Sequence, residues 1–149
     1  TVTNFKLNLL DLDEEEIEVP PAKFSSVINI PSNDFQKICR DMANLTNLIE
    51  IKSVDNQLIF TCQGDFAQQE TIMGEHNTNG ICYVEKQGED DIIQGVFSLK
   101  HLVLFTKCTN LCNSIQMFLE NDYPLIIVYQ VGSLGEIKFC LAPKKILKT

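Results

Sequence analysis

The sequence predicts an α+β domain in which two short amphipathic helices pack on antiparallel sheets. Three observations predict this class. Most apolar residues lie in short segments that alternate with polar ones, as in strands with one buried face. Two segments instead carry apolar residues at spacings of three and four, as in helices. The order strand, helix and several strands occurs twice, giving two β-α-β-β-β units, and helices segregated from many antiparallel strands define the α+β class.

In the first unit, residues 24–30 read as a strand and Pro31-Ser32 opens a helix, with Ser32 as its N-cap. The apolar stripe of this helix contains Phe35, Ile38, Cys39, Met42 and Leu45. The strands that follow are predicted at residues 48–53, 58–62 and 66–73. Asp55-Asn56 is the turn between the first two of these strands, and the polarity of the third is typical of a sheet edge.

In the second unit, residues 81–85 and 92–97 read as strands, and Ser98 is the expected cap of a helix over residues 99–107. The side chains expected to face the core from this helix are Leu99, Leu102, Val103 and Thr106. The last three strands are predicted at residues 114–119, 125–131 and 136–141, with a turn at Gly132 and Gly135.

The bulk composition is that of a single soluble domain. A chain of 149 residues favours one domain with a core large enough to fold alone. Hydrophobic residues make up 44% and charged residues 21%, which excludes wholesale disorder. Apolar runs stay well short of the roughly 20 residues that a membrane span needs, so no membrane partner is expected.

The cysteines do not form a metal-binding or disulfide pattern. The six are Cys39, Cys62, Cys82, Cys108, Cys112 and Cys140. They contain no C-x-x-C pair, and only His76 and His101 could complete a metal site. Most lie in apolar runs, where a free thiol packs as a small hydrophobic group. We therefore expect buried, reduced thiols, a reducing compartment, no metal and no cofactor.

The sequence lacks the common catalytic motifs of nucleotide-binding proteins, serine hydrolases and zinc proteases, so an enzyme is not expected. The acidic run at residues 11–18 lacks the glycine of an EF-hand loop, and a solvated loop is its simplest interpretation. A metal-dependent hydrolase that uses Asp11 and its neighbours remains as an alternative.

Charge is segregated along the chain. The net charge is −8, and acids crowd into residues 11–18 and 89–91. The cations of the two helices lie on faces other than the apolar stripes: Lys37, Arg40, Lys100 and Lys107. They are either solvated surface or a phosphate-facing surface. Four phosphate contacts give a salt slope of only about −3.6, so such a surface suits a protein held on DNA by topology and not by affinity.

Apolar residues also occur where burial is hard to arrange. Ile17 and Val19 lie inside the acidic run, which indicates either a docking edge or side chains that pin the loop to the domain. Ala142-Pro143, directly after the last predicted strand, is a second candidate edge.

Several segments resemble proliferating cell nuclear antigen, the eukaryotic-type DNA sliding clamp. They are Leu9-Leu10-Asp11-Leu12-Asp13 with Val19-Pro20, Phe35 to Asp41, Leu104 to Lys107, Tyr123-Pro124-Leu125 and Leu141 to Lys144. Their collinear order covers nearly the whole chain. The resemblance implies a non-enzymatic subunit of two similar domains, three of which close a ring around duplex DNA.

The resemblance also implies a division of the chain. Residues 1–13 correspond to the last strand of a first clamp domain that is otherwise missing, and residues 14–23 to the interdomain connecting loop. Residues 24–143 correspond to the second clamp domain, and residues 144–149 form a basic tail.

Site residues follow from the same resemblance. A pocket for partner peptides of the type Q-x-x-aliphatic-x-x-aromatic-aromatic is implied at Ile17, Val19, Pro20, Phe24, Ser98, Tyr123, Pro124, Cys140, Leu141, Ala142 and Pro143. Cys140 stands where the family more often has an aromatic residue. The four helix cations named above match positions that line the family's central channel.

A subunit interface is implied at Phe5, Leu7, Met42, Leu45 and Phe66, with core packing as the alternative for Met42 and Leu45. In the family, the last strand of the first domain pairs with an edge strand of the second. We therefore hypothesise that the strand around Phe5 adds to the sheet edge of another copy.

The implied partners are duplex DNA, encircled without sequence specificity, and DNA polymerase, nuclease, ligase and clamp loader, which dock through short peptides. The implied role is that of a processivity factor in DNA replication and repair, as a homotrimer when full length. The nucleus, or a viral replication compartment, is the expected location. A checkpoint-type or viral clamp-like subunit is the alternative.

Overall fold

The computed structural model describes residue 2 and residues 26–74, 81–86 and 92–144. The predicted strand around Phe5, the acidic run and Phe24 therefore lie outside the described residues, as do residues 87–91 and 145–149. The elements in chain order are β1 (Ser26–Pro31), α1 (Ser32–Ala43), β2 (Leu48–Val54), β3 (Gln57–Gln63), β4 (Gln68–Gly74), β5 (Cys82–Lys86), β6 (Ile93–Ser98), α2 (Leu99–Phe105), the 3₁₀ helix η1 (Thr106–Leu111), β7 (Ser114–Leu119), β8 (Leu125–Val131) and β9 (Gly135–Leu141).

The strands form two antiparallel sheets that exchange one strand each. One sheet has the order β5-β1-β7-β8-β9 and the other β4-β3-β2-β6. β1 therefore belongs to the sheet of the second unit, where it pairs with β7, and β6 belongs to the sheet of the first unit, where it pairs with β2. Each β-helix-β connection crosses from one sheet to the other. The two β-α-β-β-β units of the α+β prediction are confirmed, and the strand predicted at residues 81–85 is β5, which lies between them in the chain.

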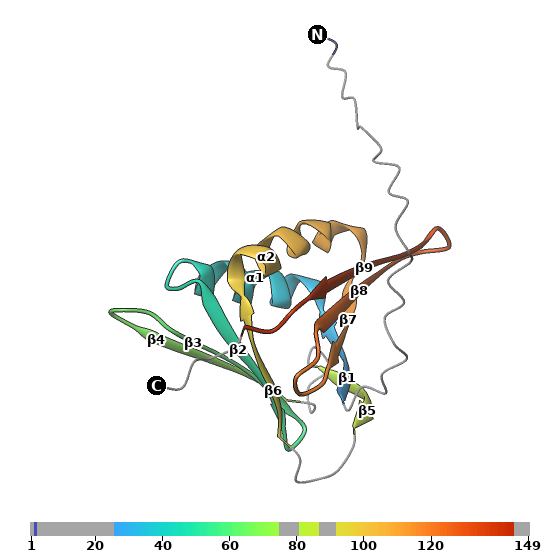
Figure 1. The fold of residues 1–149 in the computed structure, drawn as a ribbon. Helices are drawn as coiled ribbons and strands as arrows, with labels where there is room; N and C mark the ends of the chain where they lie inside the picture. Colours follow the sequence, from blue (N-terminus) through green and yellow to red (C-terminus); the bar gives the residue numbers. More distant parts are fainter. Residues whose placement is uncertain (1, 3–25, 75–80, 87–91, 145–149) are drawn as a thin grey trace, which may run out of the picture.

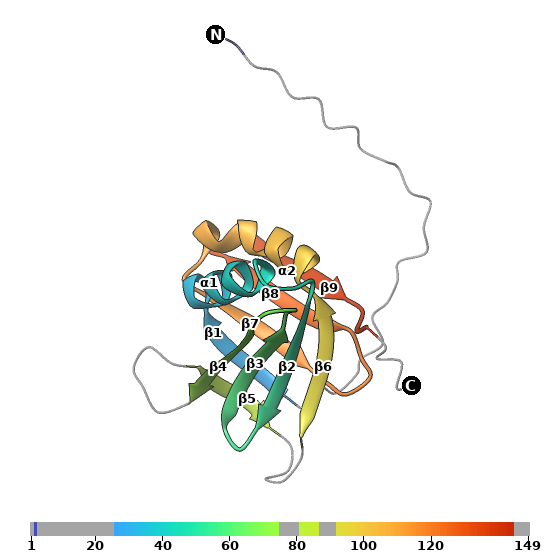
Figure 2. The same cartoon turned by 90° about the vertical axis from the view of Figure 1, so that its left-hand side faces the viewer.

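Both helical segments lie across the same end of the two sheets, side by side (Figures 1 and 2). The predicted stripe of α1 is buried at Phe35, Ile38, Cys39 and Met42, which join the core between the sheets. The prediction is wrong for Leu45, which is exposed because α1 ends at Ala43. The Gln36 side chain donates from Nε2 to the Thr106 carbonyl at 3.0 Å and ties α1 to η1.

Polar side chains also link the two sheets, from the buried Ser26 and Ser53 out to the half-buried Tyr83. The hydroxyl groups of Ser53, on β2, and Tyr83, on β5, lie 2.8 Å apart. The Tyr83 hydroxyl also donates to the Gln57 carbonyl at 2.9 Å, and the Ser26 hydroxyl lies 3.4 Å from that of Ser53. Because a buried hydroxyl costs free energy unless it is paired, these bonds favour one alignment of the sheets.

The starts of the helices differ from prediction in their capping. Pro31 takes the N-cap position of α1, and Ser32 is its first residue. The Ser32 hydroxyl donates instead to the Cys112 carbonyl at 2.6 Å, which joins α1 to the segment before β7. Ser98 does occupy the predicted N-cap of α2, but its hydroxyl lies 2.9 Å from Nδ1 of His101 and makes no capping bond.

The second helix ends earlier than predicted. α2 stops at Phe105 and the chain continues as η1, where the prediction had a single helix over residues 99–107. Two threonine hydroxyls bond back to carbonyls three residues earlier, Thr106 to Val103 at 2.8 Å and Thr109 to Thr106 at 2.5 Å. Such local bonds compete with the regular helix ladder and favour the tighter 3₁₀ turn.

The hairpin turns agree with prediction except near Phe66. Asp55 and Asn56 have φ angles of 49° and 62°, as a two-residue hairpin turn requires. The glycines at 132 and 135 also have positive φ angles. β4 is an edge strand as predicted, but it begins at Gln68, because the Gly64 N–H donates to the Ala67 carbonyl at 2.8 Å and closes a turn. Phe66 sits in that turn and is fully exposed.

The thiols only partly match prediction. Cys39 and Cys62 are buried and free, Cys108 and Cys112 are half-buried, and Cys82 and Cys140 are exposed, so the expectation of burial is wrong for the last two. Both exposed thiols lie on strands whose alternation turns them to solvent.

Among the described residues no group of three or more His, Cys, Asp or Glu side chains could hold a metal ion. In that same part of the chain, no helix is long and apolar enough to cross a membrane.

Tyr129 is the largest buried side chain, and its hydroxyl is not satisfied. It is 0% exposed, and its ring meets Phe139 edge-on at a centroid distance of 5.8 Å. The hydroxyl lies near Thr109 but has no hydrogen-bond partner among the described atoms. Burial raises the pKa of Tyr129 to about 12, and the Thr109 hydroxyl offsets part of that rise.

Replacing Tyr129 with Phe should therefore leave stability at neutral pH unchanged or higher by up to about 1 kcal/mol, because an unpaired buried hydroxyl is removed. The pKa of Tyr129 is higher in the folded than in the unfolded chain, so its titration leaves the free energy of unfolding unchanged below pH of about 10 and lowers it as pH rises toward 12. Urea unfolding from pH 7 to 11 should show a weaker alkaline loss in Tyr129→Phe than in the wild type. Equal slopes would contradict this.

Candidate functional site

A groove of about 1000 Å³ runs along the seam where the two sheets meet. Its lining residues come from both sheets: Glu50, Ile92, Gln94, Gly95, Val96, Asn121, Asp122, Pro124, Ala142, Pro143 and Lys144. One wall is the outer edge of β6 with the adjoining β2, and the other is the β7–β8 turn together with the segment after β9. The groove therefore forms where the edge of β6 faces the β7–β8 turn and the segment after β9.

Two sets of hydrogen bonds to the backbone of this edge of β6 connect the sheets. The Lys144 N–H donates to the Val96 carbonyl at 2.7 Å, so the segment after β9 runs onto the four-stranded sheet. Asn121, in the β7–β8 turn, bonds with its side chain to the backbone of Gln94 and Ile92, at 2.8 Å and 3.1 Å. Both sets join the five-stranded sheet to the four-stranded one.

The structure brings together three of the sequence-derived docking residues, Pro124 from the β7–β8 turn and Ala142 and Pro143 from the segment after β9, which line one groove. Tyr123 belongs to the same turn as Pro124 and is 44% exposed. Ser98 is buried at the end of β6, two residues beyond Val96.

Two further docking residues that the structure describes, Cys140 and Leu141, are not part of the groove lining. Cys140 and Leu141 end β9, with Cys140 exposed and Leu141 half-buried. Ile17, Val19, Pro20 and Phe24 lie outside the described residues.

Sequence reasoning missed the β6 wall and the acidic residues beside it. The alternation of residues 92–97 indicated a strand, and it correctly implies that Gln94 and Val96 point away from the core. It carried no signal that β6 is the edge of the other unit's sheet. Nor did it indicate that Asn121 would reach the backbone of that edge.

The groove combines apolar walls with scattered charge. Ile92 is 50% exposed, and Pro124 and Pro143 are partly buried. The carboxylate of Glu50 lies 3.5 Å from Nζ of Lys52, whereas Asp122 and Lys144 are exposed. Exposed apolar walls of this kind suit an extended segment with hydrophobic side chains.

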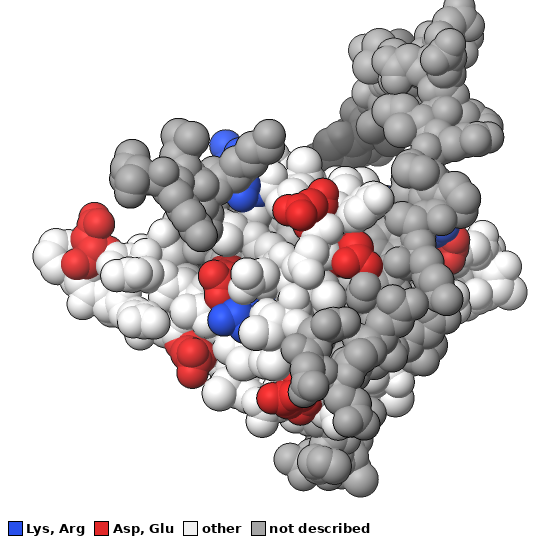
Figure 3. All heavy atoms as spheres, turned by 60° about the horizontal axis from the view of Figure 1, so that its bottom comes forward, with Lys and Arg blue, Asp and Glu red and all other residues white. Residues whose placement is uncertain are grey.

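The four predicted cations all lie on the outer surface of the helix layer. Lys37 and Arg40 are exposed on α1, and Lys100 and Lys107 are exposed on α2 and η1. Helical spacing puts Lys37 and Arg40 away from the buried stripe. Lys37 also lines, together with Asp34 and Asp41, the hollow on the flank of α1 that faces β4. On the side of the molecule turned away from the helices, acidic groups are spread across the surface with few basic ones (Figure 3).

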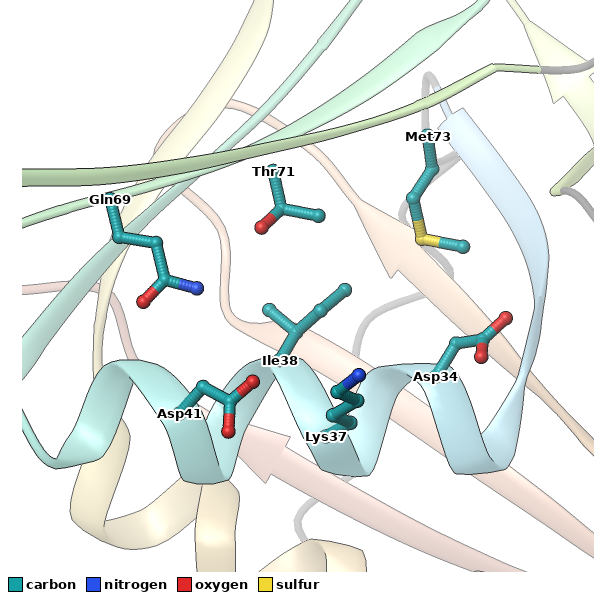
Figure 4. A pocket seen from close by; sticks show the side chains of 7 residues that line it. All are labelled: Asp34, Lys37, Ile38, Asp41, Gln69, Thr71 and Met73. Carbon is teal, nitrogen blue, oxygen red and sulfur yellow. The ribbon is translucent and has the colours of Figure 1, made fainter.

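A second, smaller hollow lies between α1 and the edge strand β4 (Figure 4). Its volume is about 290 Å³, and it is lined by Asp34, Lys37, Ile38, Asp41, Gln69, Thr71 and Met73. The β4 residues that line it, Gln69, Thr71 and Met73, lie on one face of the strand, and within the described sheet β4 pairs only with β3, so its other edge is unpaired there.

Of the sequence-derived interface residues, the three that the structure describes are absent from the lining of this hollow. Leu45 follows α1 and is 38% exposed, and Phe66 precedes β4. Met42 is fully buried in the core, which was the alternative left open for it. Phe5 and Leu7 lie outside the described residues.

The fold is that of a DNA-clamp type of domain: two antiparallel sheets are connected by helical crossovers at one end, and a groove lies where the sheets meet. Residues 18–144 match the sequence model of the family described as "Proliferating cell nuclear antigen, C-terminal domain". The chain therefore belongs to the proliferating cell nuclear antigen family, as its resemblance implied.

Individual relatives point the same way. The chain is 37% identical over 147 residues to the "Probable DNA polymerase sliding clamp 1" of Paramecium bursaria Chlorella virus 1, covering 96% of this chain and 55% of that protein. It is 34% identical over 138 residues to the "Probable DNA polymerase sliding clamp" of Acanthamoeba polyphaga mimivirus, covering 93% of this chain and 29% of that protein.

A cellular relative has a sequence identity slightly below those of the two viral relatives. The chain is 32% identical over 149 residues to the "Proliferating cell nuclear antigen" of Chaetomium thermophilum, covering 96% of this chain and 56% of that protein. The chain thus spans about half the length, or less, of these curated relatives.

Proposed function

We propose that this chain is the second domain of a DNA sliding clamp, a non-enzymatic processivity factor whose ring encircles duplex DNA and recruits replication and repair proteins. The observation that carries this proposal is the seam groove, in a domain of the proliferating cell nuclear antigen family. The groove offers a docking place for extended peptides on the side of the domain that the helices leave free.

The partner class is a short peptide with aliphatic and aromatic anchors, of the type Q-x-x-aliphatic-x-x-aromatic-aromatic. An aromatic anchor buries about 150–250 Å², or roughly 4–6 kcal/mol before entropic costs at about 25 cal/mol per Å². After those costs, binding near micromolar, about −8 kcal/mol, is expected. DNA polymerase, nuclease, ligase and clamp loader would then exchange on one ring.

The helix layer is the proposed DNA-facing surface. Exposed cations on adjacent helices, and acidic groups on the opposite side, support a duplex running along the helices. Weak phosphate contacts do not fix the ring at one position on the duplex, so the ring can slide, while encirclement prevents it from dissociating.

Ring closure is proposed at the edge of β4. An unpaired sheet edge next to a hollow suits a strand from another subunit, and the alternating segment around Phe5 has the pattern of such a strand. A homotrimer is the proposed assembly of the full-length protein. The location is the nucleus or, since two relatives are viral, a viral replication compartment.

The docking proposal predicts that Ile92→Asp weakens binding of a labelled peptide containing Gln-Lys-Thr-Leu-Ser-Ser-Phe-Phe by roughly tenfold or more, because a charge replaces an apolar wall. Ile72→Asp is the matched control, since Ile72 is 52% exposed on β4 and Ile92 is 50% exposed in the groove. Fluorescence anisotropy measures both. Equal losses in the two variants, or none in either, would contradict docking in the groove.

The DNA proposal predicts that Lys37→Ala with Arg40→Ala lowers the magnitude of the salt slope for duplex DNA binding by about 1.8, since two phosphate contacts are lost. The control is Lys52→Ala with Lys138→Ala, which removes two cations that pair with Glu50 and Glu136. Titrations of a fluorescent duplex at several low salt concentrations give the slopes. A larger drop in the control would place the phosphate contacts elsewhere.

The edge-strand proposal predicts that the 149-residue chain self-associates as its concentration rises. Phe66→Asp should reduce this association, because it puts a charge on the turn that leads into β4. Leu134→Asp, in the β8–β9 turn, is the control, since Leu134 is 90% exposed. Light scattering after size exclusion reports the mass. A strict monomer at high wild-type concentration would refute the proposal.

A further inference from the structure

One side chain closes the edge of β6 at the groove. The Asn121 Oδ1 accepts the Gln94 N–H at 2.8 Å, and its Nδ2 donates to the Ile92 carbonyl at 3.1 Å. These backbone groups lie two residues apart on one edge of a strand, where a neighbouring strand would offer alternating donors and acceptors. The amide of Asn121 therefore supplies the acceptor and the donor that the C=O and N–H of one residue of a further strand would supply.

The turn that carries Asn121 is closed by hydrogen bonds of its own. The Asn121 N–H donates to Oε1 of Glu120 at 3.0 Å, and the Tyr123 N–H donates to the Glu120 carbonyl at 3.3 Å. Asp122 has a φ of 64°, in the left-handed region that aspartate tolerates better than most residues. The amide thus reaches β6 from a closed turn and not from a long loop.

This contact joins the two sheets at one end of the groove. Asn121 belongs to the turn between two strands of the five-stranded sheet, and β6 is the edge of the four-stranded sheet. The bond from Lys144 to Val96 joins the sheets again farther along β6. Asp122 and Pro124 are carried on the same turn as Asn121, so its position relative to β6 determines how far apart the groove walls stand.

We propose that Asn121 is a positioning residue for partner docking: it fixes the spacing of the groove walls by linking the β7–β8 turn to β6. The inference rests on the proposed peptide-docking function and adds a determinant of affinity to it. A groove whose walls are fixed before binding loses less conformational freedom when a peptide docks.

The chemistry of the contact singles out asparagine. The site needs one acceptor for the Gln94 N–H and one donor for the Ile92 carbonyl, and a primary amide supplies both. An ionised aspartate at this position has only acceptors, so it would keep the first bond and set a carboxylate oxygen against the carbonyl of Ile92. Alanine would lose both bonds.

The test compares Asn121→Ala and Asn121→Asp with the wild-type 149-residue chain, using the labelled peptide containing Gln-Lys-Thr-Leu-Ser-Ser-Phe-Phe. The alanine variant should bind roughly five- to tenfold more weakly and the aspartate variant at least as weakly. Hydrogen exchange at the Gln94 amide should accelerate in Asn121→Ala but less in Asn121→Asp, which keeps the acceptor. The aspartate variant also covers the case in which alanine at this position prevents folding.

Two controls separate positioning from general destabilisation. Asn110→Ala removes an exposed asparagine from η1, away from the groove, and should leave the Kd unchanged. Ile28→Val, in the core of β1, should lower Tm without changing the Kd. If Ile28→Val weakened the peptide as much as Asn121→Ala does, the effect would be general and the inference would be overturned.

The two proposals fail in different ways. Wild-type binding with an unchanged Kd in Asn121→Ala would overturn the positioning role alone. No peptide binding by the wild type, with its fold intact, would overturn the docking function and the positioning role with it.

Discussion

The constraint on which the rest of the structure depends is the exchange of strands between the two sheets. β1 pairs with β7 in one sheet while the chain passes through α1 to β2 in the other, and β6 pairs with β2 while the chain returns through α2 and η1 to β7. Each helix is therefore a crossover between sheets, and both crossovers lie at the same end (Figure 1). The buried stripes of both helices close the core there, and their polar faces share one surface.

The same topology leaves two border strands in the four-stranded sheet, β6 and β4, and their edges differ. The edge of β6 is occupied by the Asn121 amide and the Lys144 N–H, and a groove remains between these ties. The edge of β4 opposite β3 is instead unpaired within the described sheets, and one face of β4 lines a hollow beside α1. An open edge can add a strand through backbone bonds, whereas an occupied edge cannot. The two border strands of the four-stranded sheet therefore differ in the backbone groups that they leave available.

Most elements could be predicted from the sequence because local pattern and tertiary burial agree. The strands at residues 114–119 and 125–131 have the predicted bounds, and the stripe from Phe35 to Met42 faces the core. The failures occur where a distant partner overrides a local signal. Ser32 has the chemistry of an N-cap, yet its hydroxyl bonds to Cys112, 80 residues away. The second helix tightens at Thr106 because side-chain hydroxyls compete for its carbonyls.

By itself, the sequence determined the fold class, the two amphipathic helices, the positions of the turns and the cations on the helices, because each depends on spacing along a few residues. Collinear motifs also identified the family and three residues of the groove, Pro124, Ala142 and Pro143. Only the tertiary structure decided that β6 faces the β7–β8 turn, that Asn121 bonds across the seam, and that β4 borders a hollow. Those relations join residues about 30 positions apart or more, and hydrophobic alternation says which face of a strand is buried but not which strand or turn lies beside it.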